Sequence, residues 1–238
     1  MDHLRRILGA VLTATIPLGP ALASADDELH ALPAPPIGVT RIYLVRHAQA
    51  KSNLEPRPDL PEDQLNELTD LGRQQAAAAA RALSGLGIGS VLASPVGRAQ
   101  YTAKVIARAL GLGSPGEADR LKSLVIGTGP DGHELKWAAR EAELKAGRDP
   151  RLGGGESFED VGRRVDGLVR ELARRPGARP VALVSHGEVI AAWLGHLRGV
   201  PSWKRYPPGL ANGALAVVDV GRDGKAAIRL DSFLPSAP

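Results

Sequence analysis

The sequence predicts an α/β protein with a mainly parallel sheet. Short and largely apolar runs at residues 41–45, 90–93 and 180–185 are typical of strands that are buried on both faces. Segments whose apolar residues recur at helical spacing lie between and after these runs. Strands that alternate with amphipathic helices indicate parallel pairing in an α/β domain.

The first strand, at 41–45, is followed by a polar loop at 47–67 that holds several prolines. A structureless loop of this length inside a compact domain is usually functional. Thr69 is then expected to be the N-cap of a helix over 70–83, because a threonine side chain can accept a hydrogen bond from the first helical turn. Gly85 follows the expected end of this helix.

A second helix is expected directly after the strand at 90–93. Ser94 is predicted to cap this helix, with Pro95 at the first helical position, which proline prefers. The residues expected on its apolar face are Thr102, Val105, Ile106, Ala109 and Leu110.

The region 111–157 is rich in glycine, proline and charge, so we expect it to be irregular, with one short helix around 134–145. Ser157 with Asp160 resembles a capping box, which would open an amphipathic helix. Another amphipathic helix is expected after the strand at 180–185. The last strands are expected at 213–220 and 226–231.

Composition limits the classes of function. The chain of 238 residues contains no cysteine, which excludes disulfides, thiolate catalysis and zinc sites built on cysteine. The formal charge of +4 mildly favours anionic partners, although solubility alone would explain it. Only 3% of residues are aromatic and there is no Lys/Arg block, so no nucleic-acid partner is expected.

The N-terminus has the three parts of a secretory signal peptide: two arginines, an apolar run at 7–23 and small residues at the expected cleavage point. We therefore expect residues 1–25 to be a cleaved signal, 26–40 a linker and 41–238 one domain, secreted or periplasmic. The alternative is a retained membrane anchor. Prolines interrupt the run, which is shorter than the roughly 20 residues needed to span a bilayer, so we expect no membrane contact after cleavage.

Basic side chains follow the three predicted strands at corresponding places. Arg46 and His47 end the first strand, His186 ends the third, and Arg98 lies one turn into the helix after the second. The carboxyl ends of parallel strands share one edge of the sheet, where ligands bind, so these four side chains could converge. Guanidinium forks clamp phosphate oxygens, and a neutral imidazole is a good nucleophile. The pattern predicts phosphoryl-transfer chemistry.

Five short motifs occur along the chain around these residues. They are Leu44-Val45-Arg46-His47-Ala48, Leu68-Thr69-Asp70-Leu71-Gly72, Ser94-Pro95-Val96-Gly97-Arg98-Ala99 with Thr102-Ala103, Gly154-Gly155-Glu156-Ser157, and Val184-Ser185-His186-Gly187. In content and order they resemble the histidine phosphatase superfamily, in its phosphoglycerate-mutase-like branch. The match covers roughly residues 41–220 and implies a three-layer α/β/α sandwich.

The resemblance also implies residue roles. His47 would be the nucleophile that is transiently phosphorylated, and Arg46 and Arg98 would bind the phosphoryl oxygens. His186 would donate a hydrogen bond to those oxygens, and Asn53, at the spacing of the family's substrate-binding asparagine, would hold the substrate. The resemblance implies no metal and no cofactor, and a small phosphorylated substrate or a phosphoprotein as partner.

Three positions depart from the family pattern. Ala48 replaces a glycine and Gln49 replaces a glutamate. In the third departure, Ser123 fills the position of the family's general-acid glutamate, and a hydroxyl protonates a leaving alkoxide poorly.

Two explanations for the missing acid remain open. Another carboxylate could serve: Asp131, Glu134, Glu141 or Glu156, with Glu134 and Asp131 nearest in the irregular segment. Glu188 lies close to the expected pocket and is interpreted as an acid at a helix start. Alternatively, the leaving group is good enough to need no strong acid. The predicted function is an exported phosphatase. The alternatives are a phosphate-binding relative without turnover and a phosphoglycerate-mutase-type phosphotransferase.

Overall fold

The computed structural model describes residues 25–200, 204 and 210–236. Its strands are β1 (Val39–Arg46), β2 (Ser90–Ala93), β3 (Gly116–Glu117), β4 (Val181–Ser185), β5 (Leu215–Gly221) and β6 (Ala226–Phe233). They form one sheet in the order β3-β2-β4-β1-β5-β6. The β3–β2, β2–β4 and β4–β1 pairs are parallel, whereas β5 and β6 join antiparallel. The predicted mainly parallel α/β fold is therefore confirmed.

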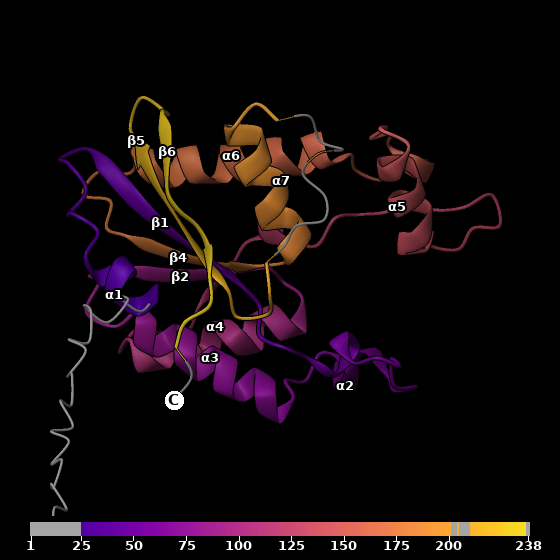
Figure 1. Ribbon diagram of the computed structural model, residues 1–238, viewed down its shortest axis with the longest axis horizontal. Coiled ribbons are helices and arrows are strands. Elements are labelled where there is room, and N and C mark those ends of the chain that lie inside the picture. The colour runs from indigo at the N-terminus through magenta and orange to yellow at the C-terminus, as the bar shows by residue number, and fades with distance from the viewer. Residues whose placement is uncertain (1–24, 201–203, 205–209, 237–238) are drawn as a thin grey trace, which may run out of the picture.

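Helices cover both faces of this sheet (Figure 1). The α-helices are α1 (Ala25–His30), α2 (Glu62–Leu65), α3 (Asp70–Ala82), α4 (Gly97–Ala109), α5 (Trp137–Lys145), α6 (Phe158–Arg174) and α7 (Gly187–Leu197). Three short 3₁₀ turns add η1 (Lys51–Asn53), η2 (Asp119–Leu121) and η3 (Leu152–Gly154). In Figure 1, α3 and α4 lie below the sheet and α6 and α7 above it, while α2 and α5 project beyond one end.

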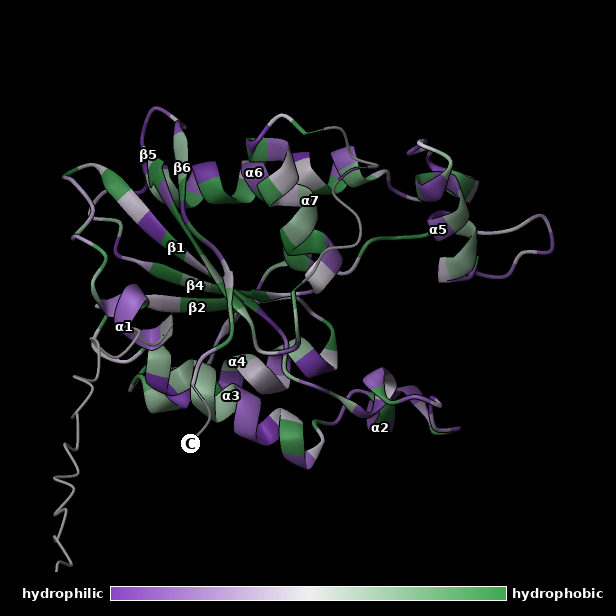
Figure 2. Cartoon of the chain, in the orientation of Figure 1, coloured by the Kyte–Doolittle hydropathy of each residue, from purple (hydrophilic) through white to green (hydrophobic). Residues whose placement is uncertain are grey.

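Alternation along the central strands divides the core into two layers. Ile42 and Leu44 of β1 pack in the cluster that includes α6 and α7, whereas Tyr43 and Val45 pack in the cluster that includes α3 and α4. Successive side chains of a strand point to opposite faces, so a strand covered on both sides must be apolar throughout. In Figure 2 the strands carry mostly green and pale colours, with a purple band on β1, and lie between helices with mixed green and purple surfaces.

Two of the predicted helix starts are confirmed. The Thr69 hydroxyl accepts from the Gly72 amide at 3.0 Å and caps α3. Ser157 and Asp160 form the capping box of α6, with the Asp160 amide 3.1 Å from the Ser157 hydroxyl. Both motifs act within one helical turn, which makes them visible in sequence.

The predicted start of α4 is wrong. The helix begins at Gly97 with Val96 as its N-cap, not at Pro95 with Ser94 as the cap. The Ser94 side chain is instead held in the protein interior by a contact to His186. The apolar face also differs from the prediction, because Val105 is half-buried and Ala109 exposed. The buried residues of α4 are Ala99, Thr102, Ala103, Ile106 and Ala107.

The segment expected to be a linker belongs partly to the folded domain. It contains most of α1, and β1 begins at Val39. Leu29 is buried in the core beside α3, and the His30 ring contacts the Ala82 carbonyl at 3.0 Å. The predicted signal peptide lies outside the described residues, apart from Ala25. Within the described part of the chain, no helix has the length and apolar character needed to cross a membrane.

Candidate active site

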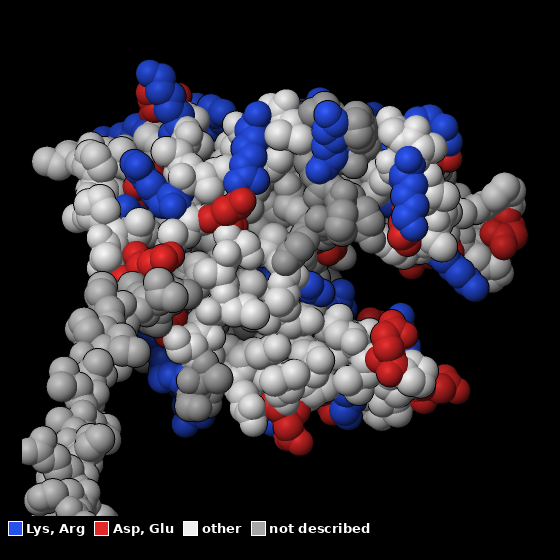
Figure 3. All heavy atoms as spheres, in the orientation of Figure 1, with Lys and Arg blue, Asp and Glu red and all other residues white. Residues whose placement is uncertain are grey.

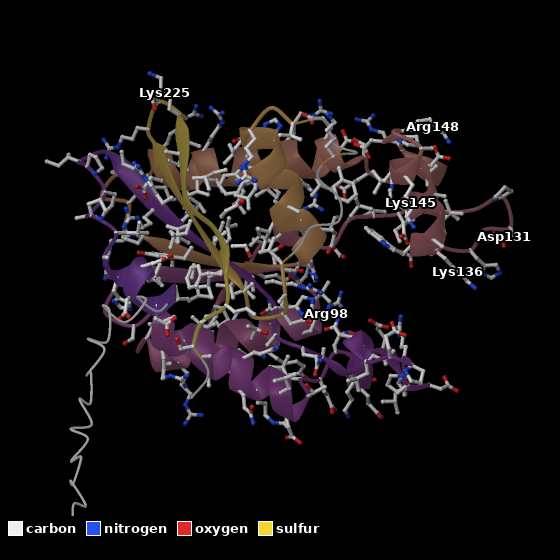
Figure 4. The ribbon with its side chains drawn as sticks, viewed as in Figure 1. Arg98, Asp131, Lys136, Lys145, Arg148 and Lys225 are labelled. Atoms are coloured by element: carbon white, nitrogen blue, oxygen red, sulfur yellow. The ribbon has the colours of Figure 1, made fainter. Side chains whose placement is uncertain are left out.

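A cleft of about 1030 Å³ opens where β1, β2 and β4 end. Arg46, Asn53, Arg98, Ser123 and Glu188 are among its lining residues, which also come from the α2 loop and the arm carrying α5. Figure 3 shows the hollow between these two projections, with Lys/Arg atoms at its inner end. Figure 4 places Arg98 there.

His47 lies directly after β1 and is 3% exposed. Its Nδ1 is 2.9 Å from the Ala48 carbonyl oxygen, which can only accept, so Nδ1 carries the proton. Arg98 Nε donates to Nε2 at 3.1 Å, which identifies Nε2 as the atom with the free electron pair. The fold thus fixes the tautomer in which Nε2 is the nucleophilic atom.

His186 faces His47 behind Arg98; Arg98 lines the cleft, whereas neither imidazole is among the lining residues. The two ring centroids are 5.2 Å apart, with the ring planes inclined at 65°. His186 Nε2 is 2.8 Å from the Ser94 hydroxyl, and its Nδ1 is 3.5 Å from Arg98 Nη2. The two imidazoles predicted to meet therefore do meet, and Arg98 contacts both.

Both histidines are held neutral by their surroundings. Burial lowers the pKa of His47 well below its ordinary value, and the proximity of His186 and the positive charge of Arg98 lower it further. Burial also lowers the pKa of His186, with Arg98 adding to the effect. A neutral imidazole keeps its electron pair, which is the form that attacks phosphorus.

Asn66 orients Arg98, a role that sequence reasoning missed. The Asn66 Oδ1 accepts from Arg98 Nη1 at 3.0 Å, while its amide nitrogen donates to the Glu62 carbonyl at 2.8 Å. Asn66 is 8% exposed although it follows a polar loop helix. No local pattern marks it, because its partner is 32 residues away.

Arg46 presents an unpaired nitrogen beside this centre. Its Nη1 donates to the Leu210 carbonyl, but its Nε is buried with no hydrogen-bond partner among the described residues. A Cβ on Gly187 would lie 3.3 Å from the Arg46 side chain, so glycine there lets the start of α7 pack closely against the guanidinium. A buried donor without a partner is costly unless a ligand satisfies it.

Asn53 and Ser52 line the same cleft from η1. The Asn53 Oδ1 accepts from the Ala50 amide at 3.0 Å and from Asn212 at 3.4 Å, which leaves its amide N–H groups to donate. The hydroxyl of Ser52 is buried and finds no partner in the part of the chain that the structure describes. Asn53 was predicted here, whereas Ser52 was not.

The candidate acids differ sharply in position. Ser123 donates to Glu188 Oε1 at 2.5 Å, and both residues line the cleft. Glu134 lines the cleft but is exposed on the arm. Asp131 lies on the outer loop of that arm, far from Arg98 (Figure 4).

Two further candidate acids are held by cationic side chains. Glu156 is paired with Arg164 at 2.6 Å, and Glu141 with Lys145 at 2.6 Å. Neither lines the cleft.

The substituted Gln49 turns away from the cleft. Its Oε1 accepts from the Thr69 hydroxyl at 2.7 Å, and its backbone carbonyl lies so close to α3 that a Cβ on Gly72 would meet it at 1.9 Å. The change from glutamate therefore affects the junction with α3 rather than the cleft wall.

No group of three or more metal-ligating side chains occurs within residues 25–200, 204 and 210–236. The arginines that line the cleft and the two imidazoles that Arg98 contacts suit a phosphoryl anion.

Comparisons with known proteins agree with this chemistry. The family model for the histidine phosphatase superfamily (branch 1) matches residues 42–232. A probable phosphoglycerate mutase GpmB of Salmonella paratyphi B is 30% identical over 75% of this chain and 84% of its own. The structure of mycobacterial glucosyl-3-phosphoglycerate phosphatase is 30% identical, with a TM-score of 0.62 over 83% of this chain and all of that one.

More distant structures share the fold. Phosphoserine phosphatase from Entamoeba histolytica superimposes with a TM-score of 0.65 at 22% identity, over 83% of this chain and 98% of its own. The residues that the family model matches include the ends of β1, β2 and β4, where the cleft opens. The sequence resemblance and the geometry therefore identify the same site. The chain belongs to the histidine phosphatase superfamily, branch 1.

Proposed function

We propose that the protein is a phosphatase that hydrolyses a phosphorylated small molecule through a phosphohistidine formed on His47. The observation that carries this proposal is the fixed tautomer of His47: Nδ1 is bound to the Ala48 carbonyl, and Nε2 is turned to Arg98 at 3.1 Å. Relatives named as phosphatase and probable phosphoglycerate mutase support the reaction class.

In the first step, the phosphoryl oxygens bind Arg46 and Arg98, which neutralise their charge. The electron pair of His47 Nε2 forms a bond to phosphorus, and the bond from phosphorus to the leaving oxygen breaks. Nδ1 keeps its proton and its hydrogen bond to Ala48, which stabilises the positive charge that develops on the ring. Positioning and charge neutralisation provide most of the rate enhancement.

In the second step, water attacks phosphorus and the bond to Nε2 breaks. The water loses a proton, inorganic phosphate forms, and the ring of His47 regains its electron pair. His186 lies 5.2 Å from His47 between ring centroids, near enough to donate to a phosphoryl oxygen in both steps. Asn53 amide groups can hold the substrate at the cleft wall.

The test measures phosphate release from p-nitrophenyl phosphate and from an acyl phosphate, from acidic to neutral pH. His47→Ala should abolish release, and acid-labile phosphate should accumulate on a His186→Ala variant. Full activity of His47→Ala, or phosphate binding without any turnover by the wild type, would contradict the proposal. Interconversion of phosphoglycerates faster than phosphate release would favour a mutase instead.

We further propose that the protein is exported, on the strength of the basic, apolar and small-residue segments within residues 1–25. Expression of the full chain with a C-terminal tag in a Gram-negative host should yield periplasmic protein whose mass lacks this segment. Protein that stays in the cytoplasm with residues 1–25 attached would contradict export.

A further inference from the structure

The position of the family's general acid holds Ser123, whose hydroxyl contacts a carboxylate from another element. Ser123 Oγ donates to Glu188 Oε1 at 2.5 Å. The two residues are 65 positions apart, and both line the cleft that contains Arg46 and Arg98. A carboxyl group is therefore present beside Ser123, although it belongs to Glu188 of α7.

Neighbouring elements hold both partners in place. Glu188 is the second residue of α7, which follows His186 directly and packs against Arg46 through Gly187. Arg164 of α6 donates to the carbonyls of Arg120 and Lys122 at 2.6 and 2.8 Å, which fixes the backbone before Ser123. The contact between the two side chains therefore joins two anchored segments.

The other acids that line the cleft are less suited to this role. Glu62 binds Arg57 at 3.3 Å and Asn66 at 3.1 Å on an exposed helix. Glu134 is exposed on the arm that carries α5. Glu188 is half-buried and lies close to both Arg46 and Arg98.

We propose that Glu188, oriented by Ser123, is the general acid that protonates the leaving oxygen. The proposal rests on the phosphohistidine mechanism above and adds the proton transfer to it. Ser123 occupies Oε1 as a donor, which leaves Oε2 of the protonated carboxyl to face the substrate. Glu188, at the start of α7, thereby performs the proton donation that the resemblance assigns to the family's glutamate.

The proton balance is simple. As His47 Nε2 bonds to phosphorus and the phosphorus–oxygen bond breaks, the proton on Glu188 Oε2 passes to the leaving oxygen, which departs as an alcohol. The resulting Glu188 carboxylate then takes a proton from the attacking water, whose oxygen bonds to phosphorus as the bond to Nε2 breaks. Glu188 ends protonated, and His47 ends neutral.

The experiment uses the dependence of kcat/KM on the leaving group. Glu188→Gln keeps an oxygen that accepts from Ser123 but removes the acidic proton. It should lower kcat/KM for alkyl phosphates by about 100-fold or more. It should change kcat/KM for p-nitrophenyl phosphate only a few-fold, because nitrophenolate leaves without protonation. Since kcat/KM reports steps up to phosphohistidine formation, the later water step does not affect it.

A rescue variant tests the geometry. Ser123→Glu combined with Glu188→Gln returns a carboxyl to the family position and should restore most of the alkyl phosphatase activity. Ser123→Ala should lower activity on alkyl phosphates while shifting the pH profile of kcat/KM, because the carboxyl loses its orienting donor. An exposed acid outside the cleft lining provides the matched control: Glu28→Gln in α1 should leave both substrates unaffected.

Three outcomes would overturn the proposal. These are an equal effect of Glu188→Gln on both substrate classes, no effect on either, or a selective loss with Glu134→Gln in its place. In each case, acid-labile phosphate on His47 shows separately whether the phosphohistidine mechanism holds, so failure of the acid assignment and failure of the proposed function are distinguishable.

Discussion

At the scale of single residues, the reactivity of His47 follows from its neighbours. Burial and the charges around it keep the ring neutral, and the Ala48 carbonyl selects the tautomer. An exposed histidine would be partly protonated near pH 6.5 and would present either nitrogen. The same groups that neutralise the phosphoryl charge thus also prepare the nucleophile.

The lowered pKa of His47 predicts a loss of stability in mild acid. The unfolded chain binds a proton on this histidine near pH 6.5, whereas the folded protein does so only at lower pH. The free energy of unfolding should therefore fall as pH drops below about 6.5, by up to about 1.4 kcal/mol per pH unit for each such histidine. His186 should contribute in the same direction.

Urea denaturation between pH 7.5 and 5.5, in phosphate-free buffer, measures this dependence. In His47→Gln, the free energy of unfolding should depend less steeply on pH, because the contribution of one histidine is removed and the others remain. If the free energy of unfolding varied with pH equally in the wild type and in this variant, the assignment of a lowered pKa to His47 would be contradicted.

Asn66 provides a second prediction at this scale. Asn66→Ala removes the acceptor that orients the Arg98 guanidinium. Hydrogen bonds to charged groups contribute about 1.5–3 kcal/mol, so kcat/KM should fall at least about 10-fold. Inhibition by inorganic phosphate should weaken in parallel, because Arg98 binds the same oxygens. Unchanged phosphate inhibition in a folded variant would show that Arg98 keeps its position without Asn66.

At the scale of elements, α6 supports the cleft wall through one side chain. Arg164 pairs with Glu156 at 2.6 Å and donates to the backbone carbonyls of Arg120 and Lys122, before Ser123. Glu156 in turn accepts from the Val125 amide at 3.1 Å. The motif glutamate is therefore a structural partner of Arg164, and helix α6 fixes a segment that has little regular structure of its own.

Arg164→Met should release this segment. We expect a loss of about 2 kcal/mol of stability, because several carbonyls and Glu156 lose their donor. Activity on alkyl phosphates should fall further than activity on p-nitrophenyl phosphate, since Ser123 no longer holds Glu188. Arg163→Met is the matched control, because the neighbouring Arg163 is an exposed partner of Asp160 and should have little effect. Equal losses in the two variants would contradict the role given to Arg164.

The helix starts show which features of a helix depend only on residues close in the sequence. Thr69 and the Ser157–Asp160 capping box act within one turn and were predicted correctly. Ser94 was expected to cap α4, but its hydroxyl is 2.8 Å from His186, which is 92 residues away. The same hydroxyl also accepts from the Val96 amide at 3.2 Å, so it closes the turn before α4 and reaches into the site as well. The sequence does not reveal the second contact, because it joins distant segments.

At the scale of the whole molecule, a buried ion pair joins β1 to the antiparallel part of the sheet. Arg41 Nε lies 2.7 Å from Asp219 Oδ1 and Arg41 Nη2 lies 3.0 Å from Oδ2, with side chains 5% and 3% exposed. Arg229 of β6 reaches the same carboxylate at 2.8 Å. One acid therefore ties together three adjacent strands.

Asp219→Ala should be severely destabilising, because it leaves Arg41 buried without a counter-charge. Breaking a buried pair in this way costs about 3–5 kcal/mol. Arg229→Ala should cost less than about 1 kcal/mol, since Arg229 is 42% exposed. Chemical denaturation of both variants provides the comparison. An equally small loss of stability in Asp219→Ala and Arg229→Ala would show that water reaches the Arg41–Asp219 pair.

The sequence by itself determined every strand except the short β3, most helices, the family, and the four basic side chains that converge on one edge of the sheet. These features depend on apolar periodicity, capping patterns and the rule that parallel strands end together, all of which are local or topological.

The tertiary structure decided the tautomer of His47, the orientation of Arg98 by Asn66 and the contact of Glu188 with Ser123. Each depends on distances of a few ångströms between segments far apart in the chain. Such distances are set by how the helices pack on the sheet, and residue spacing along the sequence does not specify them.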